Sequence, residues 1–431
     1  MTKHATNSVF TPTSQAKLTF VERDETINSE IVDALMTPGK QMILYGHSGT
    51  GKSTLIVNKL NQTYESVIIS RCTNSSSFDG LLLDSFDQLE VYYADSKTAS
   101  SNSSISGTLK SSYSLINAQI KAGNSSSEST TEMRIVPPQL TAQRLAQFLG
   151  AAKCCWVIED FHKLKDEEKV RFSQNMKVFV DTATQFPEVK MIAIGAVGTA
   201  REVVEYDSEL SNRVSEILVP LLSKNELHQI LEKGEKLLNI EFEQQVKNKI
   251  VEFSNGLGSI CHQLALNICF SNNLYETSDE LINFRVSDLK LALEKFIKSN
   301  SDTLKGRFER ATKVQRERTY NNGRIILKAL AKSKKDGTSH AELLSIIRQE
   351  HKKYPPANLT LYLKKLQEND RGNVVCQNID NGLFTFSDPF IKTYAQCVFD
   401  SKDELEEDPL EIERQVTAIF EKFIEKITNR N

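Results

Sequence analysis

The chain has 431 residues, of which 39% are hydrophobic and 25% are charged, and its formal net charge is −3. This length predicts two or three domains, and the small net charge excludes an overall electrostatic attraction to nucleic acid or membrane. A polar first segment, no run of 18 apolar residues and seven cysteines without a Cys-x-x-Cys pair predict a reduced, cytoplasmic protein without a membrane span or structural zinc.

Residues 1–40 are predicted to be a leader that precedes the first domain. Their one informative stretch is Phe20-Val21-Glu22-Arg23-Asp24-Glu25. After it, apolar residues recur at the spacing of an amphipathic helix, namely Ile27, Ile31, Val32 and Leu35.

A complete phosphate-binding loop (Walker A) follows the leader. It reads Gly46-His47-Ser48-Gly49-Thr50-Gly51-Lys52-Ser53 and is followed by Thr54. An apolar run of strand type, 41–45, precedes the loop, and an amphipathic helical pattern begins at Lys52. A glycine-rich turn in this position directs backbone N–H groups and the positive end of a helix towards a polyphosphate. We therefore expect Lys52 to reach the β- and γ-phosphates of a nucleotide and Ser53 to be a ligand of Mg²⁺.

Strands and helices alternate from 41 to 222, which predicts an α/β fold with a parallel sheet covered on both faces. The predicted strands are the apolar runs 41–45, 66–71, 154–158, 190–195 and 215–221. A polar, serine-rich stretch at 98–132 interrupts the alternation and is predicted to be an insertion. It is either a flexible surface excursion or a hairpin that becomes ordered on a partner.

Two acidic residues, Glu159 and Asp160, follow the third predicted strand. The carboxyl end of a parallel strand places such side chains at the same edge of the sheet as the phosphate loop. We expect Glu159 to hold Mg²⁺, partly through water, and Asp160 to orient or deprotonate the attacking water. The alternative is that the two acids only cap the next helix. Loop and acids together predict a parallel-sheet P-loop NTPase core over 41–222.

Residues 223–300 are predicted to form a helical lid. Ser223 and Glu226 have the spacing of a capping box, which marks the start of its first helix. Helical patterns follow at 223–238, 241–254, 259–271 and 286–299. The charged stretch 301–320 is predicted to be a connecting helix or a linker.

Residues 321–398 are predicted to form a C-terminal winged helix-turn-helix domain. Three helical patterns precede two short strands around Asn381-Gly382, which is a strong hairpin signal. Thr338 or Ser339 would cap the second helix, and the third helix, 357–367, would be the recognition helix. The tail 401–431 is acidic and then amphipathic.

The charge of this C-terminal region leaves its role open. Residues 301–400 contain 18 Lys and Arg against 11 Asp and Glu. Duplex DNA is therefore a possible ligand of the recognition helix and the residues before it, through Lys352, Lys353, Lys364 and Lys365. Packing against the nucleotide-binding domain is the alternative that we favour, because the region lacks a dense arginine cluster.

The phosphate loop, the acidic pair in Trp156-Val157-Ile158-Glu159-Asp160-Phe161-His162 and the leader stretch together resemble the AAA+ and STAND signal-transduction ATPases. The resemblance is to the branch of origin-recognition initiators and bacterial STAND-like ATPases, and it spans roughly 18–300. It implies ATP as the nucleotide and a leader that packs near the adenine. Arg23 is thereby expected among the nucleotide-binding residues, although Glu22 replaces a glycine of the family pattern.

The resemblance implies further site residues. Arg213 occupies the segment that carries an arginine finger for a neighbouring subunit, and its alternative is a surface ion pair. His262 lies where the family has a sensor arginine or a Gly-x-Pro motif, and it could contact the nucleotide or be a satisfied core histidine. The fourth strand offers no polar sensor before Thr199, which departs from the family pattern.

The leading functional hypothesis is an ATP-binding and slowly hydrolysing switch whose nucleotide state controls conformation and self-association. Because the sequence has no second catalytic motif, we expect a separately encoded effector protein as partner. The resemblance implies a role in bacterial conflict or anti-phage defence. The main alternative is a DNA-binding ATPase of the initiator or transposition type. A further alternative is a scaffold that binds ATP and turns it over very slowly.

Overall fold

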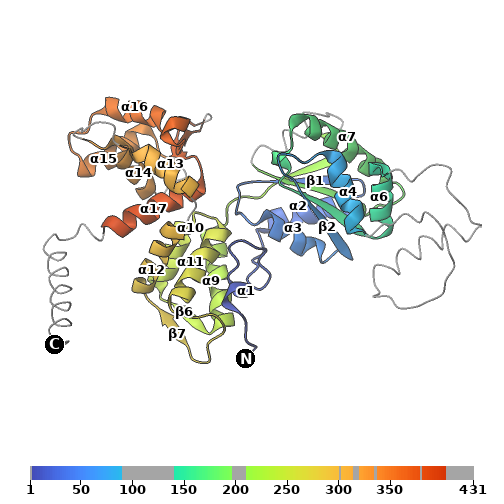
Figure 1. Ribbon diagram of the computed structural model, residues 1–431, viewed down its shortest axis with the longest axis horizontal. Helices are drawn as coiled ribbons and strands as arrows, with labels where there is room; N and C mark the ends of the chain where they lie inside the picture. Colours follow the sequence, from blue (N-terminus) through green and yellow to red (C-terminus); the bar gives the residue numbers. More distant parts are fainter. Residues whose placement is uncertain are drawn as a thin grey trace, which may run out of the picture. The chain divides into compact units, whose positions relative to one another are not determined.

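The computed structural model describes residues 2–89, 140–196, 210–299, 302–313, 320–333, 337–378 and 381–403 (Figure 1). The chain divides into two compact units, and each is described by itself. One unit is Phe20–Leu222, and the other combines Met1–Thr19 with Ser223–Asn431. The predicted leader 1–40 is thus shared between the two units. The predicted insertion 98–132 and, beyond Asp403, the predicted tail lie outside the described residues.

A five-stranded parallel sheet forms the centre of the Phe20–Leu222 unit. Its strands lie in the order β2-β3-β4-β1-β5 and have the bounds β1 Gln41–Tyr45, β2 Ser66–Arg71, β3 Cys154–Glu159, β4 Met191–Gly195 and β5 Val214–Leu218. All five predicted strands are present, and the predicted parallel α/β fold class is confirmed. The strand predicted over 215–221 already ends at Leu218, shortly before Pro220, which has no N–H to donate to a ladder.

Helices cover both faces of this sheet. One face packs against α2 (Glu25–Met36) and α3 (Lys52–Leu60). The other packs against α4 (Phe78–Gln88), α6 (Ala142–Ala151) and α7 (Asp166–Thr182).

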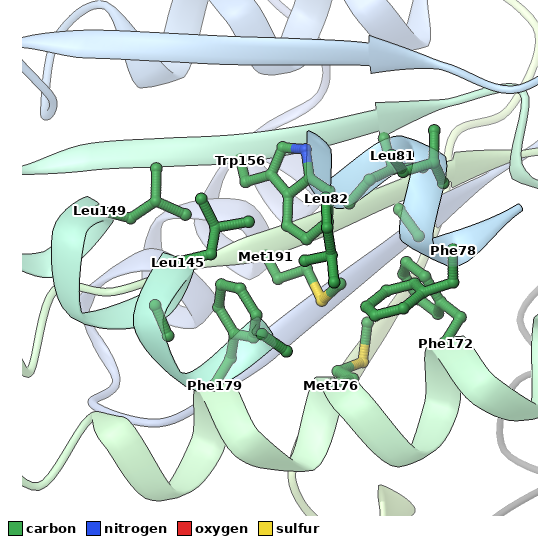
Figure 2. Packing of buried hydrophobic residues seen from close by; sticks show 14 of the residues in the cluster. Phe78, Leu81, Leu82, Leu145, Leu149, Trp156, Phe172, Met176, Phe179 and Met191 are labelled. Atoms are coloured by element: carbon green, nitrogen blue, oxygen red, sulfur yellow. The ribbon is translucent and has the colours of Figure 1, made fainter. Parts of the chain in front are cut away.

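Figure 2 shows the second of these layers, in which Trp156 of β3 lies among side chains of α4, α6 and α7. Trp156 is fully buried, and its indole N–H donates to Ser70 Oγ at 3.1 Å. Burial of each large apolar side chain contributes about 1.5–3 kcal/mol, so this layer holds β3 and its acidic end in place.

The helical segment of the second unit follows the predicted order. It consists of α9 Lys224–Leu238, β6 Ile240–Phe242, α10 Gln244–Ser254, α11 Gly258–Ser271, β7 Ile282–Phe284 and α12 Val286–Ser299. The predicted capping box is present, because Glu226 N–H donates to Ser223 Oγ and Ser223 N–H donates to Glu226 Oε2. The parallel pair of β6 and β7 was not predicted; β6 takes the first residues of the helix predicted over 241–254.

Residues before Phe20 pack against this helical segment. A short helix, α1 (Thr6–Val9), ends at the fully buried Phe10. The Phe10 ring lies where a side chain at Gly234, in the interior of α9, would stand, since a Cβ there would be 2.3 Å from Phe10 Cζ. A glycine inside a helix costs about 1 kcal/mol relative to alanine, and here it admits an aromatic ring.

The C-terminal domain comprises Asp302–Asp403. Its elements are α13 Asp302–Thr312, α14 Asn322–Lys332, α15 His340–Glu350, α16 Pro356–Lys365, η3 Asn369–Arg371, β8 Val375–Gln377, β9 Phe384–Phe386 and α17 Pro389–Asp403. The two strands pair antiparallel, and Ser339 caps α15 in a capping box. The stretch predicted as a connecting helix or linker contains α13, which joins the core of this domain through Phe308 and Ala311. Within the described ranges, no helix combines the length and apolar character needed to cross a membrane.

Candidate functional site

The phosphate loop joins β1 to α3, as its sequence predicts. Gly46 has φ +151°, and a Cβ on it would lie 2.3 Å from the carbonyl oxygen of Val219, which follows the neighbouring strand β5. Gly51 has φ +85° and is the N-cap of α3, where among the described residues no side chain caps the helix. The first N–H groups of α3 therefore remain available to a ligand, and the helix end favours an anion.

The ammonium of Lys52 lies against the loop itself. Its Nζ donates to the carbonyl oxygens of Gly46 at 2.9 Å and His47 at 2.7 Å. Burial lowers the pKa of Lys52 from 10.5 to about 8, and the charge of Asp160 partly opposes this shift. The lysine whose pKa Asp160 affects is thus the one predicted to bind phosphate.

The remaining loop residues divide into buried and accessible positions. Thr50 is 1% exposed, and its hydroxyl donates to the carbonyl of His47 at 3.0 Å. His47, Ser48 and Gly51 are exposed, whereas Gly49, Lys52, Ser53 and Thr54 are half-buried. Ser53 lies in the first turn of α3 and is half-buried.

Arg23 of the leader contacts the loop backbone. Its guanidinium is buried and donates to the carbonyl oxygens of Thr50 at 2.5 Å and Pro220 at 3.0 Å. The resemblance predicts that Arg23 binds the nucleotide. In the structure its guanidinium contacts the backbone of the loop. Glu22, which replaces the family's glycine, forms an ion pair with Lys59 of α3 at 2.7 Å.

The acidic pair ends β3 at the same edge of the sheet. Glu159 is the last residue of the strand, and Asp160 follows it in a left-handed backbone conformation, with φ 59° and ψ 32°. Strand β4 lies between β3 and β1, so the acids are two strands away from the loop rather than on its direct neighbour. Asp160 is the N-cap residue of the short 3₁₀-helix η1 (Phe161–Lys163), but its side chain makes no capping hydrogen bond there. The next long helix, α7, begins at Asp166 with Lys165 as its N-cap.

Two cations that the sequence analysis did not single out contact these acids. Arg71, the cross-strand partner of Glu159 on β2, donates from Nε to Glu159 Oε2 at 3.0 Å. Lys163 donates to Asp160 Oδ2 at 2.6 Å. Arg71 could have been found from the sequence, because it ends an apolar predicted strand. Glu159 was singled out for the same reason, at the end of β3.

Arg213 lies just before β5, in the Phe20–Leu222 unit. Its side chain is 44% exposed and lies 3.6 Å from Asp181 Oδ1. Its carbonyl accepts the N–H of Gln41 at the start of β1. The structure thus gives it the surface ion pair that the sequence analysis names as the alternative, in a long and exposed form. Val197 to Thr199, which follow the fourth strand, lie outside the described residues.

His262 belongs to the other unit, in α11. It is 4% exposed, its Nδ1 accepts the backbone N–H of Thr11 at 3.1 Å, and its ring meets that of Phe10 edge-on. Burial lowers its pKa to about 4, so the ring is neutral at physiological pH. These contacts favour the satisfied core histidine over the nucleotide contact.

The residues of the Phe20–Leu222 unit fit a magnesium nucleotide. The loop supplies N–H groups and a lysine for phosphate, and Ser53 with Glu159 supplies the oxygen ligands that Mg²⁺ prefers. Within the described ranges, no three His, Cys, Asp or Glu side chains gather into a metal site.

Comparisons with known proteins concern the fold. No protein-family model and no curated protein matches the sequence. Among solved structures, the chain is similar to a Walker-type ATPase of Pyrococcus abyssi, with 14% identity, 88% of this chain and 100% of that chain covered, and a TM-score of 0.48. For Cdc6p from Pyrobaculum aerophilum these values are 12%, 93%, 99% and 0.41. For the ORC1 protein of Aeropyrum pernix in complex with DNA they are 11%, 94%, 98% and 0.42.

With identities and TM-scores this low, the fold assignment rests on the chain itself. A parallel sheet carries a glycine loop between β1 and α3, and an acidic pair ends β3 at the edge where the loop lies. The chain therefore has the fold of a P-loop NTPase.

Proposed function

We propose that this protein binds ATP with Mg²⁺ and hydrolyses it slowly. The observation that carries the proposal is the position of Lys52, which is half-buried at the start of α3 and donates to two carbonyl oxygens of the loop, at the sheet edge where Asp160 follows β3. A phosphate-binding cation and a candidate general base are thus parts of one site.

The protein's own groups would act as follows. The loop N–H groups hold the phosphates, and Lys52 exchanges its two carbonyl partners for phosphate oxygens. Ser53 and, through water, Glu159 would hold Mg²⁺, which would supply positive charge at the phosphates. Asp160 accepts a proton from the attacking water. Arg23 keeps the loop carbonyls of Thr50 and Pro220 at fixed positions, so that the N–H groups retain their direction, which makes it a positioning residue.

We further propose that the nucleotide state controls conformation and self-association, with Arg213 as the group that acts on a neighbouring subunit. Its support is exposure, because the side chain is 44% exposed and its ion pair to Asp181 is long and can be broken at little cost. A separately encoded effector is the partner expected of such a switch, since the sequence contains no second catalytic motif. A role in bacterial defence is supported by the family resemblance alone.

The experiment combines ATP hydrolysis with mass photometry in the absence of nucleotide, with ADP and with a non-hydrolysable ATP analogue. We expect assembly with the analogue, and neither assembly nor hydrolysis in Lys52→Ala. Lys165→Ala, which removes an exposed lysine of the same unit, is the control and should behave as the wild type. Assembly that is unchanged in Lys52→Ala would contradict the switch.

Mixing two inactive variants tests Arg213 in the same assay. Arg213→Ala should hydrolyse ATP at least about tenfold more slowly. A mixture with Asp160→Asn should regain activity, because one subunit then supplies the arginine and the other the acid. If the mixture stays inactive while both variants assemble, Arg213 does not act between subunits.

Duplex DNA binding is the second candidate function. It is favoured by three exposed lysines, Lys352, Lys353 and Lys364, next to or on α16, the third helix of the proposed winged-helix domain 321–398. Lys365 instead lies over the ring of Tyr362. Mass photometry with added duplex separates the candidates, since assembly that occurs only on DNA would favour the initiator-type function.

A further inference from the structure

A buried polar contact joins the helical segment to the C-terminal domain within the second unit. Helix α10 of the helical segment ends at Asn255, which has the left-handed backbone of a C-cap, with φ 46° and ψ 37°. Helix α17 of the C-terminal domain packs against α10 and α12 on one side and α14 on the other. The contact lies where α17 passes the end of α10.

Three side chains form the contact. The Asn255 side-chain amide donates to Thr393 Oγ1 at 2.9 Å and to Gln396 Oε1 at 2.7 Å. The hydroxyl of Thr393 donates to the carbonyl of Phe253 at 2.6 Å, and Gln396 Nε2 donates to the carbonyl of Ala331 in α14 at 3.3 Å. Together these hydrogen bonds connect α10, α17 and α14.

Because the network is buried, losing only some of its hydrogen bonds costs free energy of folding. Thr393 is fully buried and Gln396 is 9% exposed. A buried polar group that loses its partner bears its whole desolvation cost, so a half-made network is less stable than either the complete one or a fully hydrated one. A partly buried ion pair between Lys249 and Asp400, at 3.3 Å, joins the same two helices.

We propose that Asn255, Thr393 and Gln396 form a latch with two discrete states, closed and hydrated. In the closed state the helical segment and the C-terminal domain move as one body. This inference deepens the proposed switch, because the latch transmits a nucleotide-dependent movement of the helical segment to the C-terminal domain. The contact itself does not depend on that function and can be tested without nucleotide.

Hydrogen exchange of the full chain tests the latch directly. In Asn255→Gly the amide network is lost, while glycine keeps the left-handed C-cap that the backbone needs. We expect amides of α17 around Thr393 and Gln396 to exchange about tenfold faster, because the hydrogen bonds that remain no longer satisfy the buried groups.

The chain offers a matched control in Asn239. It caps α9 in the same left-handed conformation, with φ 56°, and its side chain bonds Ser278 rather than α17. Asn239→Gly should leave exchange in α17 unchanged. Thr393→Val, which removes the hydroxyl without touching the cap, should repeat the effect of Asn255→Gly. Equal exchange of α17 in Asn255→Gly and Asn239→Gly would overturn the proposal.

A second arm adds the non-hydrolysable ATP analogue. In the wild type the analogue should alter exchange in both the helical segment and the C-terminal domain. Asn255→Gly should bind it with unchanged affinity but confine the response to the helical segment. A response that still reaches the C-terminal domain would overturn the coupling role. No response in the wild type would count against the proposed switch, whereas the comparison without nucleotide would still decide the latch.

Discussion

The phosphate loop and the acidic pair lie at one edge of the same sheet, but different interactions hold them. Contacts to backbone fix the loop: Gly46 lies under the Val219 carbonyl, Lys52 bonds two loop carbonyls and Arg23 bonds that of Thr50. The acids have side-chain partners instead, in the ion pairs of Glu159 with Arg71 and Asp160 with Lys163.

This difference suits the loop to ligand binding and the acidic pair to a change of partners when a ligand binds. A loop fixed by backbone sterics has its geometry before a ligand arrives, which reduces the cost of binding. Ion pairs with exposed partners are worth at most about 1 kcal/mol, so they are easily exchanged. Arg71 is 71% exposed and Lys163 is 43% exposed, and both can leave when Mg²⁺ or water requires the carboxylate. The loop is therefore the permanent part of the site and the acidic pair the adjustable part.

Replacing the acids should impair hydrolysis strongly, whereas replacing their cationic partners should impair it little. Asp160→Asn keeps the shape but loses the base, and we expect hydrolysis to fall by about 10²–10⁴-fold with ATP binding retained. Glu159→Gln should raise the Mg²⁺ concentration needed for half-maximal activity. Arg71→Ala is the control, because it leaves both carboxylates in place and should remain active at saturating Mg²⁺. Steady-state hydrolysis across a Mg²⁺ titration measures all three, and loss of activity in Arg71→Ala would contradict the adjustable pair.

Two glycines of the loop sharpen the claim that backbone sterics hold it. Gly46→Ala would place a Cβ against the Val219 carbonyl as well as strain φ, and should cost about 2–4 kcal/mol of unfolding free energy. Gly51→Ala meets nothing within 4 Å and bears only the left-handed strain, about 1–2 kcal/mol. Denaturant unfolding without nucleotide compares them. Equal destabilisation would show that contact with β5 does not fix the loop.

What could be read from the sequence follows the same division. The loop, its strand and its helix are one continuous stretch with local rules, and 41–45 and 66–71 were predicted with their exact bounds. Arg71 reaches Glu159 only because β2 and β3 pair in register, and that pairing joins residues far apart in the chain. Strand β4 was predicted, but its position between β3 and β1 was not, since strand order depends on the whole sheet.

In the second unit, His262 and Asn255 show the same limit of prediction from sequence. His262 was given a possible nucleotide contact because it lies where the resembled family has a sensor residue, whereas its partner in the structure, Thr11, lies in the leader. Asn255 gave only the signal of a helix end, while its partners lie on α17. Buried polar networks between distant segments leave no periodicity in a sequence, whereas helix caps such as Ser223 and Ser339 do.

Substitution of Lys52 should have the smallest effect. It tests how much free energy of folding is lost by burying the lysine charge next to the loop. Burial lowers its pKa from 10.5 to about 8, so between these values the unfolded chain binds more protons and stability rises with pH. Below pH 8 both states are protonated and the cost of burying the charge is fully present. Lys52→Met lacks this cost, and it should therefore melt above the wild type at pH 7.

The same reasoning fixes how that advantage changes with pH. It should shrink as the pH rises from about 8 to 10.5, because the folded wild-type protein then loses the Lys52 proton and no longer bears the buried charge, whereas the unfolded chain keeps its proton. Thermal unfolding at pH 7, 9 and 10.5 in the absence of nucleotide measures it, with Lys165→Met as the exposed control. Parallel pH profiles for Lys52→Met and the wild type would mean that solvent reaches the Lys52 ammonium freely. The loop carbonyls would then not be its partners, and the contrast with the exposed ion pairs of the acids would disappear.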